Sequence, residues 1–117
     1  MILVDTSVWI HHFRSHDRQL ATLLNDDQVV VHPMVIGELA CGNLPKRKQI
    51  LALFHELKQA PILSDHEVLS FIEQNALMGK GLGWIDVHLI GSSLRMGAGL
   101  WTKDKQLHQI CVHFGIA

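Results

Sequence analysis

Short apolar runs alternate with helix-forming segments along this chain. Ile2-Leu3-Val4 and Val29-Val30-Val31 are three residues long and rich in β-branched side chains, and Leu100-Trp101-Thr102 is similar. Such runs are typical of strands buried on both faces, as in parallel sheets whose connections are helices. The alternation predicts an α/β fold with a central, mainly parallel sheet that helices cover on both sides.

The segments between these runs carry apolar residues at helical spacing, with capping residues, Pro33 and glycines near their ends. Because 117 residues supply enough apolar material for one core, a single domain over residues 1–117 is expected. Helices are predicted over 6–13, 20–24, 33–42, 45–58, 65–77, 84–96 and 103–114, with a further short strand at Ile62-Leu63.

Charge and cysteine content limit the classes of protein. Ten basic residues against 11 acidic ones create no general positive field, so a nucleic acid would be held locally or through bound cations. Cys41 and Cys111 lack CxxC spacing and have apolar neighbours, which predicts reduced, buried thiols and a cytoplasmic protein. Neither a signal peptide nor an apolar stretch of about 18 residues is recognisable, so no membrane association is expected.

Four acidic residues lie far apart in the sequence, yet the predicted layout brings them to one edge of the sheet. Asp5 and Asp104 follow strands directly, and the carboxyl ends of parallel strands are where ligands bind. Glu38 lies within an apolar segment, where an unpaired carboxylate is costly, and Asp86 lies in the first turn of an apolar helix. Taken singly, the aspartates also suit helix capping or the helix dipole, and Glu38 could point outward.

Several carboxylates gathered at one edge raise one another's pKa unless a cation neutralises them. Mg²⁺ and Mn²⁺ prefer oxygen ligands, and Mg²⁺ often takes one or two protein carboxylates with water and substrate phosphates. The joint pattern therefore predicts a divalent-cation site for phosphodiester chemistry. In that hypothesis the cation makes a water more acidic and offsets charge on the phosphoryl oxygens.

The segments Val4-Asp5-Thr6-Ser7-Val8-Trp9, Gly37-Glu38-Leu39 and Trp101-Thr102-Lys103-Asp104, with Asp86 and its helix, carry a family resemblance. Over nearly its whole length the chain resembles PIN-domain ribonucleases, and most of all the VapC-like toxins of bacterial type II toxin-antitoxin systems. The resemblance implies a three-layer α/β/α sandwich. The chain ends at Ala117, soon after its last helix, so a short or missing edge strand is expected where relatives often continue.

The resemblance also implies an activity: metal-dependent endonucleolytic cleavage of RNA. Asp5 and Asp86 would be direct Mg²⁺ ligands, with Mn²⁺ as a substitute, and Glu38 and Asp104 would complete the acidic pocket. It further implies a homodimer and a cognate antitoxin whose tail can occupy the active-site groove. Hydroxyl groups that would support an acid or a metal-bound water belong to Thr6, Ser7 and Thr102.

Basic residues near these segments could contact RNA phosphates, although such charges are more often a solvated face. The nine histidines show no zinc-ligand spacing, and surface or partly buried histidines are expected. The three tryptophans could stack on bases, but packing in the core or a dimer contact is predicted. The loop Gly79–Gly83 lacks a P-loop ending and is interpreted as a flexible connector or a loop on the substrate side. The candidate phosphate contacts are Lys46, Arg47, Lys48, Lys80, Lys103 and Lys105.

Other classes of function remain as alternatives. A catalytically inactive PIN-like module could bind RNA or protein with its acids acting only as caps. A phosphoacceptor receiver domain requires paired acids after its first strand, and here Thr6 and Ser7 follow Asp5. A haloacid-dehalogenase-type phosphatase requires a second aspartate where Ser7 stands, so both enzyme alternatives are disfavoured.

Overall fold

The computed structural model describes residues 1–117, and its centre is a four-stranded parallel sheet. Central strand β1 pairs with β2 and β4, so that Leu3 lies opposite both Val30 and Leu100. This confirms the prediction of an α/β fold around a parallel sheet. The order across the sheet is β3-β2-β1-β4, and the strands are β1 (Ile2–Val4), β2 (Val29–Val31), β3 (Lys58–Gln59) and β4 (Gly99–Trp101).

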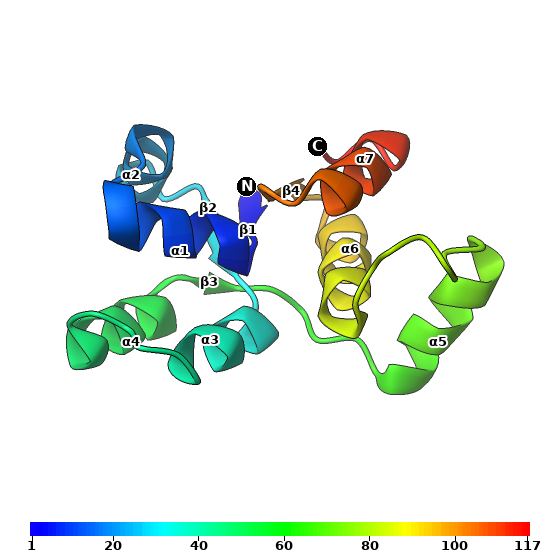
Figure 1. Ribbon diagram of the computed structural model, residues 1–117, viewed down its shortest axis with the longest axis horizontal. Coiled ribbons are helices and arrows are strands. Elements are labelled where there is room, and N and C mark those ends of the chain that lie inside the picture. The colour runs from blue at the N-terminus through cyan, green and yellow to red at the C-terminus, as the bar shows by residue number, and fades with distance from the viewer.

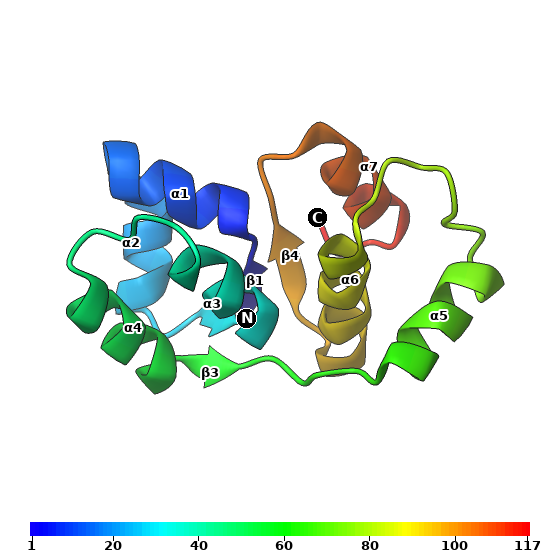
Figure 2. The ribbon, with the colours of Figure 1, turned by 60° about the horizontal axis from the view of Figure 1, so that its bottom comes forward.

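Seven helices surround the sheet. In Figures 1 and 2, α1, α2 and α4 lie to the left of β1 and β4, whereas α5, α6 and α7 lie to the right, so helices cover both faces. This is the layering of a PIN-like α/β/α sandwich. None of the helices has the length and hydropathy that a membrane span requires. The helices are α1 (Thr6–Ser15), α2 (Arg18–Asn25), α3 (Pro33–Ala40), α4 (Arg47–Glu56), α5 (Asp65–Gln74), α6 (Trp84–Met96) and α7 (Lys105–His113).

The main core lies between the sheet and the helices around it. Leu3, Val4 and Val29–Val31 are buried because helices cover both sides of β1 and β2. On α1, the fully buried Trp9 packs edge-to-face against Phe54 of α4, with ring centroids 5.0 Å apart. This packing anchors α1 behind β1 and so fixes the position of the residues that join them.

Two local predictions were wrong. The third strand is Lys58–Gln59 and not Ile62-Leu63, and Ile62 is 61% exposed. Because β3 lies at the edge of the sheet with both side chains exposed, it carries no apolar pattern. Cys41 is exposed at the end of α3, whereas Cys111 is buried as predicted; both thiols are free.

The opposite edge of the sheet is β4, and a short continuation covers part of it. The Leu100 N–H donates to the Ile116 carbonyl over 2.7 Å, although residues 115–117 form no strand. A short or missing edge strand was expected as a departure from the family pattern, and the sheet has four strands with one backbone bond beyond β4.

Two histidines are fully buried, in contrast to the expectation of surface or partly buried ones. His32 Nδ1 accepts the Met34 N–H over 3.0 Å, so the proton lies on Nε2, which is 3.1 Å from Ser92 Oγ. Ser92 in turn donates to the Pro61 carbonyl over 2.6 Å. Burial, with the nearby His88, lowers the pKa of His32 to about 4. The network therefore requires a neutral His32 ring.

We expect the free energy of unfolding to fall as the pH is lowered from 6.5 toward about 4, because the unfolded chain protonates His32 before the native state does. Urea titrations at pH 7, 6 and 5 measure this slope. His32→Asn keeps a capping side chain and removes the titration, so its slope should be shallower. Burial also lowers the pKa of His88, so some slope should remain. An unchanged slope in His32→Asn would contradict the assignment.

Candidate active site

Asp5 lies where β1 passes into α1. Its N–H donates to the Trp101 carbonyl over 2.9 Å, and the residue is 7% exposed. Although it occupies the N-cap position of α1, its side chain makes no capping hydrogen bond. Oδ2 accepts instead from the hydroxyls of Ser7, over 2.8 Å, and Thr102, over 2.7 Å. The capping interpretation is therefore wrong for Asp5, and its Oδ1 makes no hydrogen bond within the protein.

Backbone groups fix the direction of both hydroxyls. The Lys103 N–H donates to Ser7 Oγ, and the Asp104 N–H donates to Thr102 Oγ1, each over 3.0 Å. Each hydroxyl has a single proton, and that proton is directed at Asp5. The pairing of β1 with β4 brings Ser7 and Thr102 together, so the sheet itself orients the Asp5 carboxylate.

Removing either hydroxyl should therefore weaken the site without unfolding the protein. We expect Ser7→Ala or Thr102→Val to lower activity about 10- to 100-fold, the usual effect of losing a group that orients a metal ligand. Thr102→Ser keeps the hydroxyl and should retain most activity. Ser93→Ala is a matched control, since Ser93 Oγ is buried without a hydrogen-bond partner. RNA-cleavage rates measure the effect, and equal losses in Thr102→Val and Thr102→Ser would contradict it.

Glu38 is exposed on α3, so of the two interpretations of this carboxylate the outward-pointing one is correct. Its Oε1 accepts the Thr6 hydroxyl over 2.7 Å. Thr6 is the first residue of α1, and the bond therefore ties the start of α1 to α3 and holds Glu38 beside the β1–α1 junction.

Asp86 lies in the first turn of α6, half-buried, and its Oδ2 accepts the Gly83 N–H over 2.8 Å. Burial raises the pKa of Asp86 above its ordinary value, and the charges of Asp5, Asp104 and Glu38 raise it further. The other three carboxylates are therefore near enough to disfavour the ionised form of Asp86.

Asp104 follows β4 and is exposed. Its Oδ1 accepts the Leu107 N–H over 2.9 Å, so Asp104 does cap α7 as the simpler interpretation required. It also contributes negative charge at Asp86. One carboxylate thus stabilises a helix and adds to the acidic group at the same time.

No basic side chain neutralises these four acids. The ion pairs of the protein involve Asp17, Asp65 and Glu67. No three His, Cys, Asp or Glu side chains form a ready metal cage. Mg²⁺ requires only one or two carboxylates, and water and phosphate oxygens complete its shell. The free Oδ1 of Asp5 and the disfavoured charge of Asp86 fit such a cation.

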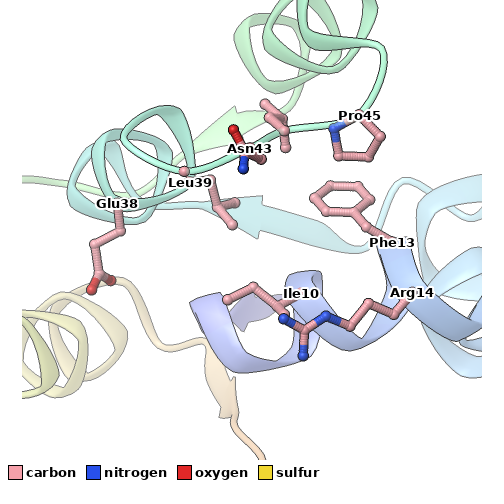
Figure 3. Close-up of a pocket in the computed structure, with 9 residues that line it drawn as sticks. Ile10, Phe13, Arg14, Glu38, Leu39, Asn43 and Pro45 are labelled. Carbon is pink, nitrogen blue, oxygen red and sulfur yellow. The ribbon is translucent and has the colours of Figure 1, made fainter.

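A cavity of about 510 Å³ adjoins Glu38. Figure 3 shows Glu38 at one end and Phe13 with Pro45 at the other, while Ile10, Phe13 and Arg14 come from α1. The far wall is the segment after α3, which includes Asn43. Sequence reasoning missed this groove, because its two walls lie about 30 residues apart and no motif marks them.

The six basic residues proposed as phosphate contacts lie in two places. Lys46, Arg47 and Lys48 lie at the start of α4, which Figure 2 places at the far left, apart from α6 and α7. Arg47 donates to the Ala40 and Gly42 carbonyls and so supports the α3–α4 loop.

Lys103 and Lys105 flank Asp104 in the sequence, and Lys103 Nζ is 3.8 Å from Asp17 Oδ2. Lys80 precedes Gly81, which packs against Gln106 of α7 so closely that a β-carbon would lie 2.3 Å from the Gln106 side chain. Lys80, Lys103 and Lys105 therefore surround the start of α7.

Comparison with known proteins identifies the family of the chain. Residues 2–112 match the PIN domain family. The chain is 48% identical over 118 residues to "Ribonuclease VapC32" of Mycobacterium tuberculosis, in both the CDC 1551 / Oshkosh and the ATCC 25618 / H37Rv strains. The match covers 100% of this chain and 95% of the relative. The chain therefore belongs to the PIN-domain family, within its VapC-like branch.

Proposed function

We propose that the protein is a Mg²⁺-dependent endoribonuclease and the toxin of a type II toxin-antitoxin system. The observation that carries this proposal is the group of four acids, Asp5, Glu38, Asp86 and Asp104. The charges of the other three raise the pKa of Asp86, and none of the four has a basic partner. The full-length similarity to a protein named as a ribonuclease supports RNA as the substrate. A single domain over residues 1–117 would carry the whole activity.

In this proposal Asp5 and Asp86 hold the cation, and Mn²⁺ can replace Mg²⁺. The bound cation would supply Lewis-acid stabilisation of phosphoryl charge and make a water more acidic. Ser7 and Thr102 keep the Asp5 carboxylate in one orientation by donating to Oδ2. Thr6 holds Glu38 beside the site, and Glu38 and Asp104 increase the negative potential that attracts the cation.

Two protein partners belong to the proposal. A cognate antitoxin would place its tail in the groove beside Glu38, where Arg14 and Asn43 offer polar contacts among apolar residues. The protein would also form a homodimer and act in the cytoplasm. Lys80, Lys103 and Lys105 are the basic residues best placed for RNA phosphates, since they surround the start of α7 beside Asp104.

An inactive PIN-like binding module is the second candidate. It is supported by Asp104, which caps α7 as such a module would require. Against it stands Asp5, whose side chain makes no cap and whose Oδ1 is free.

Cation removal separates the two candidates. We expect purified protein to cleave total RNA in Mg²⁺ or Mn²⁺ and to lose all measurable cleavage in excess chelator. Restoring the cation should restore cleavage, since the chain has a buried apolar core to hold the fold together. RNA fragments resolved on denaturing gels measure the effect. Cleavage that continues in chelator would reject the proposed function, and an absence of cleavage in either cation would favour the binding module.

A further inference from the structure

Trp84 is the one tryptophan that the fold leaves outside its apolar clusters. Trp9 is fully buried in the main core, and Trp101 packs against that core. Trp84 is 39% exposed, so the predicted core position is wrong for it, whereas a dimer contact stays a prediction. It is the first residue of α6, two residues before Asp86. A large aromatic side chain near the acidic site therefore keeps part of its surface open to solvent.

A rigid neighbour holds the indole ring. His88 lies one helical turn further along α6, and its ring meets that of Trp84 edge-to-face, with centroids 4.9 Å apart and planes at 78°. His88 is fully buried, and neither of its ring nitrogens has a hydrogen-bond partner. Trp84 therefore rests on a fixed aromatic support while its outer surface remains open to solvent.

The direction of the Trp84 side chain determines which part of a substrate it can contact. Successive helical residues turn by about 100°, so Trp84 and Asp86 diverge by about 200°. Trp84 therefore lies on the outer rim of the α6 terminus and not in the acidic pocket. Lys80, in the loop before α6, is exposed and is a candidate phosphate contact. On the other side of the indole ring, His88 Nε2 lies 3.8 Å from Asp65 Oδ1.

We propose that the exposed face of Trp84 is a stacking platform for an unpaired base of single-stranded RNA, in a nucleotide that flanks the phosphate held at the acidic pocket. This inference rests on the proposed function. Every base has a π-face, so such a platform binds strands of many sequences, and Lys80 would contact the adjoining backbone. His88 would act as a positioning residue by fixing the tilt of the indole ring.

The first test measures binding in chelator, without any cleavage. The probes are hexaadenylate RNA and a hexamer with the same backbone whose sugars lack bases. For hexaadenylate, we expect Trp84→Ala to weaken binding about 5- to 150-fold and Trp84→Phe to weaken it less. The baseless probe should bind wild type and Trp84→Ala alike. Leu69→Ala is the control, since Leu69 is a 54% exposed apolar residue of α5, and it should bind hexaadenylate like wild type.

The second test measures cleavage in Mg²⁺. Trp84→Ala should raise KM for single-stranded RNA with little change in kcat, because a stacked neighbour contributes equally to binding of substrate and transition state. Equal hexaadenylate binding by wild type and Trp84→Ala would overturn the inference while leaving the nuclease proposal intact. Failure of wild type to cleave in any cation would reject the nuclease proposal, although the binding result could still stand.

Dilution in the absence of RNA provides a last check. If Trp84 is a contact between two copies of the chain, the difference in fluorescence between wild type and Trp84→Ala will change as the protein dissociates, and Trp84→Ala will shift the oligomeric state. That outcome would overturn the base platform. Fluorescence that responds to hexaadenylate and not to dilution supports it.

Discussion

Asp5→Asn should lower the kcat/KM for RNA cleavage about 10³-fold. The reason is chemical, because an amide is a poor replacement for a carboxylate that binds a divalent cation, and such a cation contributes several kcal/mol to charge stabilisation. In Asp5→Asn the side-chain amide would also lie against two hydroxyl donors, Ser7 and Thr102, that are directed at Oδ2 in the wild type. Initial rates over a range of RNA concentrations measure the loss.

Asp86→Asn should cause a similar loss of activity and, in addition, stabilise the cation-free protein at neutral pH. The raised pKa of Asp86 means that folding disfavours its charged form, so the native state is less stable above that pKa than below it. An uncharged amide removes this cost and can still accept the Gly83 N–H. Urea unfolding in chelator at pH 7 measures the gain.

Asp17→Asn is the matched control for both variants. Asp17 caps α2 by accepting the Leu20 N–H over 3.0 Å, and asparagine caps helices equally well. Its activity should therefore remain near that of wild type. Cleavage that persists in both Asp5→Asn and Asp86→Asn, or an equal loss in Asp17→Asn, would contradict the proposed site.

The second large effect that we expect is a rise in thermal stability when the cation binds. A cation that binds only the native state, at a free concentration 100 times its Kd, adds about 2.7 kcal/mol to the free energy of unfolding. For a chain of this size that gain corresponds to an increase of about 10 °C in Tm. We expect Mg²⁺ or Mn²⁺ to produce this increase, because it would neutralise carboxylates that lack any basic partner.

Two comparisons make the thermal measurement specific. Sodium chloride at the same ionic strength should produce a much smaller shift, since it screens charge without occupying a site. Asp5→Asn and Asp86→Asn should each lose most of the Mg²⁺-dependent increase, whereas Asp17→Asn should retain it. An equal increase in wild type and in both site variants would show that the cation acts elsewhere on the protein.

The sequence allowed the main strands to be predicted because β1 and β2 are covered on both faces, which requires apolar residues at every position. The edge strand β3 escaped prediction because Lys58 and Gln59 contribute backbone bonds alone and remain exposed. The exposure of Trp84 could not be predicted either, since an aromatic residue at the start of an apolar helix usually packs inward.

For the acidic residues, the sequence predicts where they lie in the fold but not which contacts their carboxylates make. Asp5 and Asp104 both follow strands, and the sequence cannot distinguish a capping aspartate from one that leaves an oxygen free. The structure separates them: the Asp104 carboxylate caps α7, whereas the Asp5 carboxylate accepts only hydroxyl protons. The decisive contacts come from Ser7 and Thr102, and their meeting depends on the pairing of β1 with β4.

The pairing of β1 with β4 also has a consequence for synthesis of the protein. Thr102 donates to Asp5 across 97 positions of sequence, so the first and last parts of the chain build the same carboxylate environment. β1 also lacks one of its two neighbours until residues 99–101 have been made. A partly translated chain therefore lacks both the Thr102 hydroxyl and the β4 pairing that orient the Asp5 carboxylate.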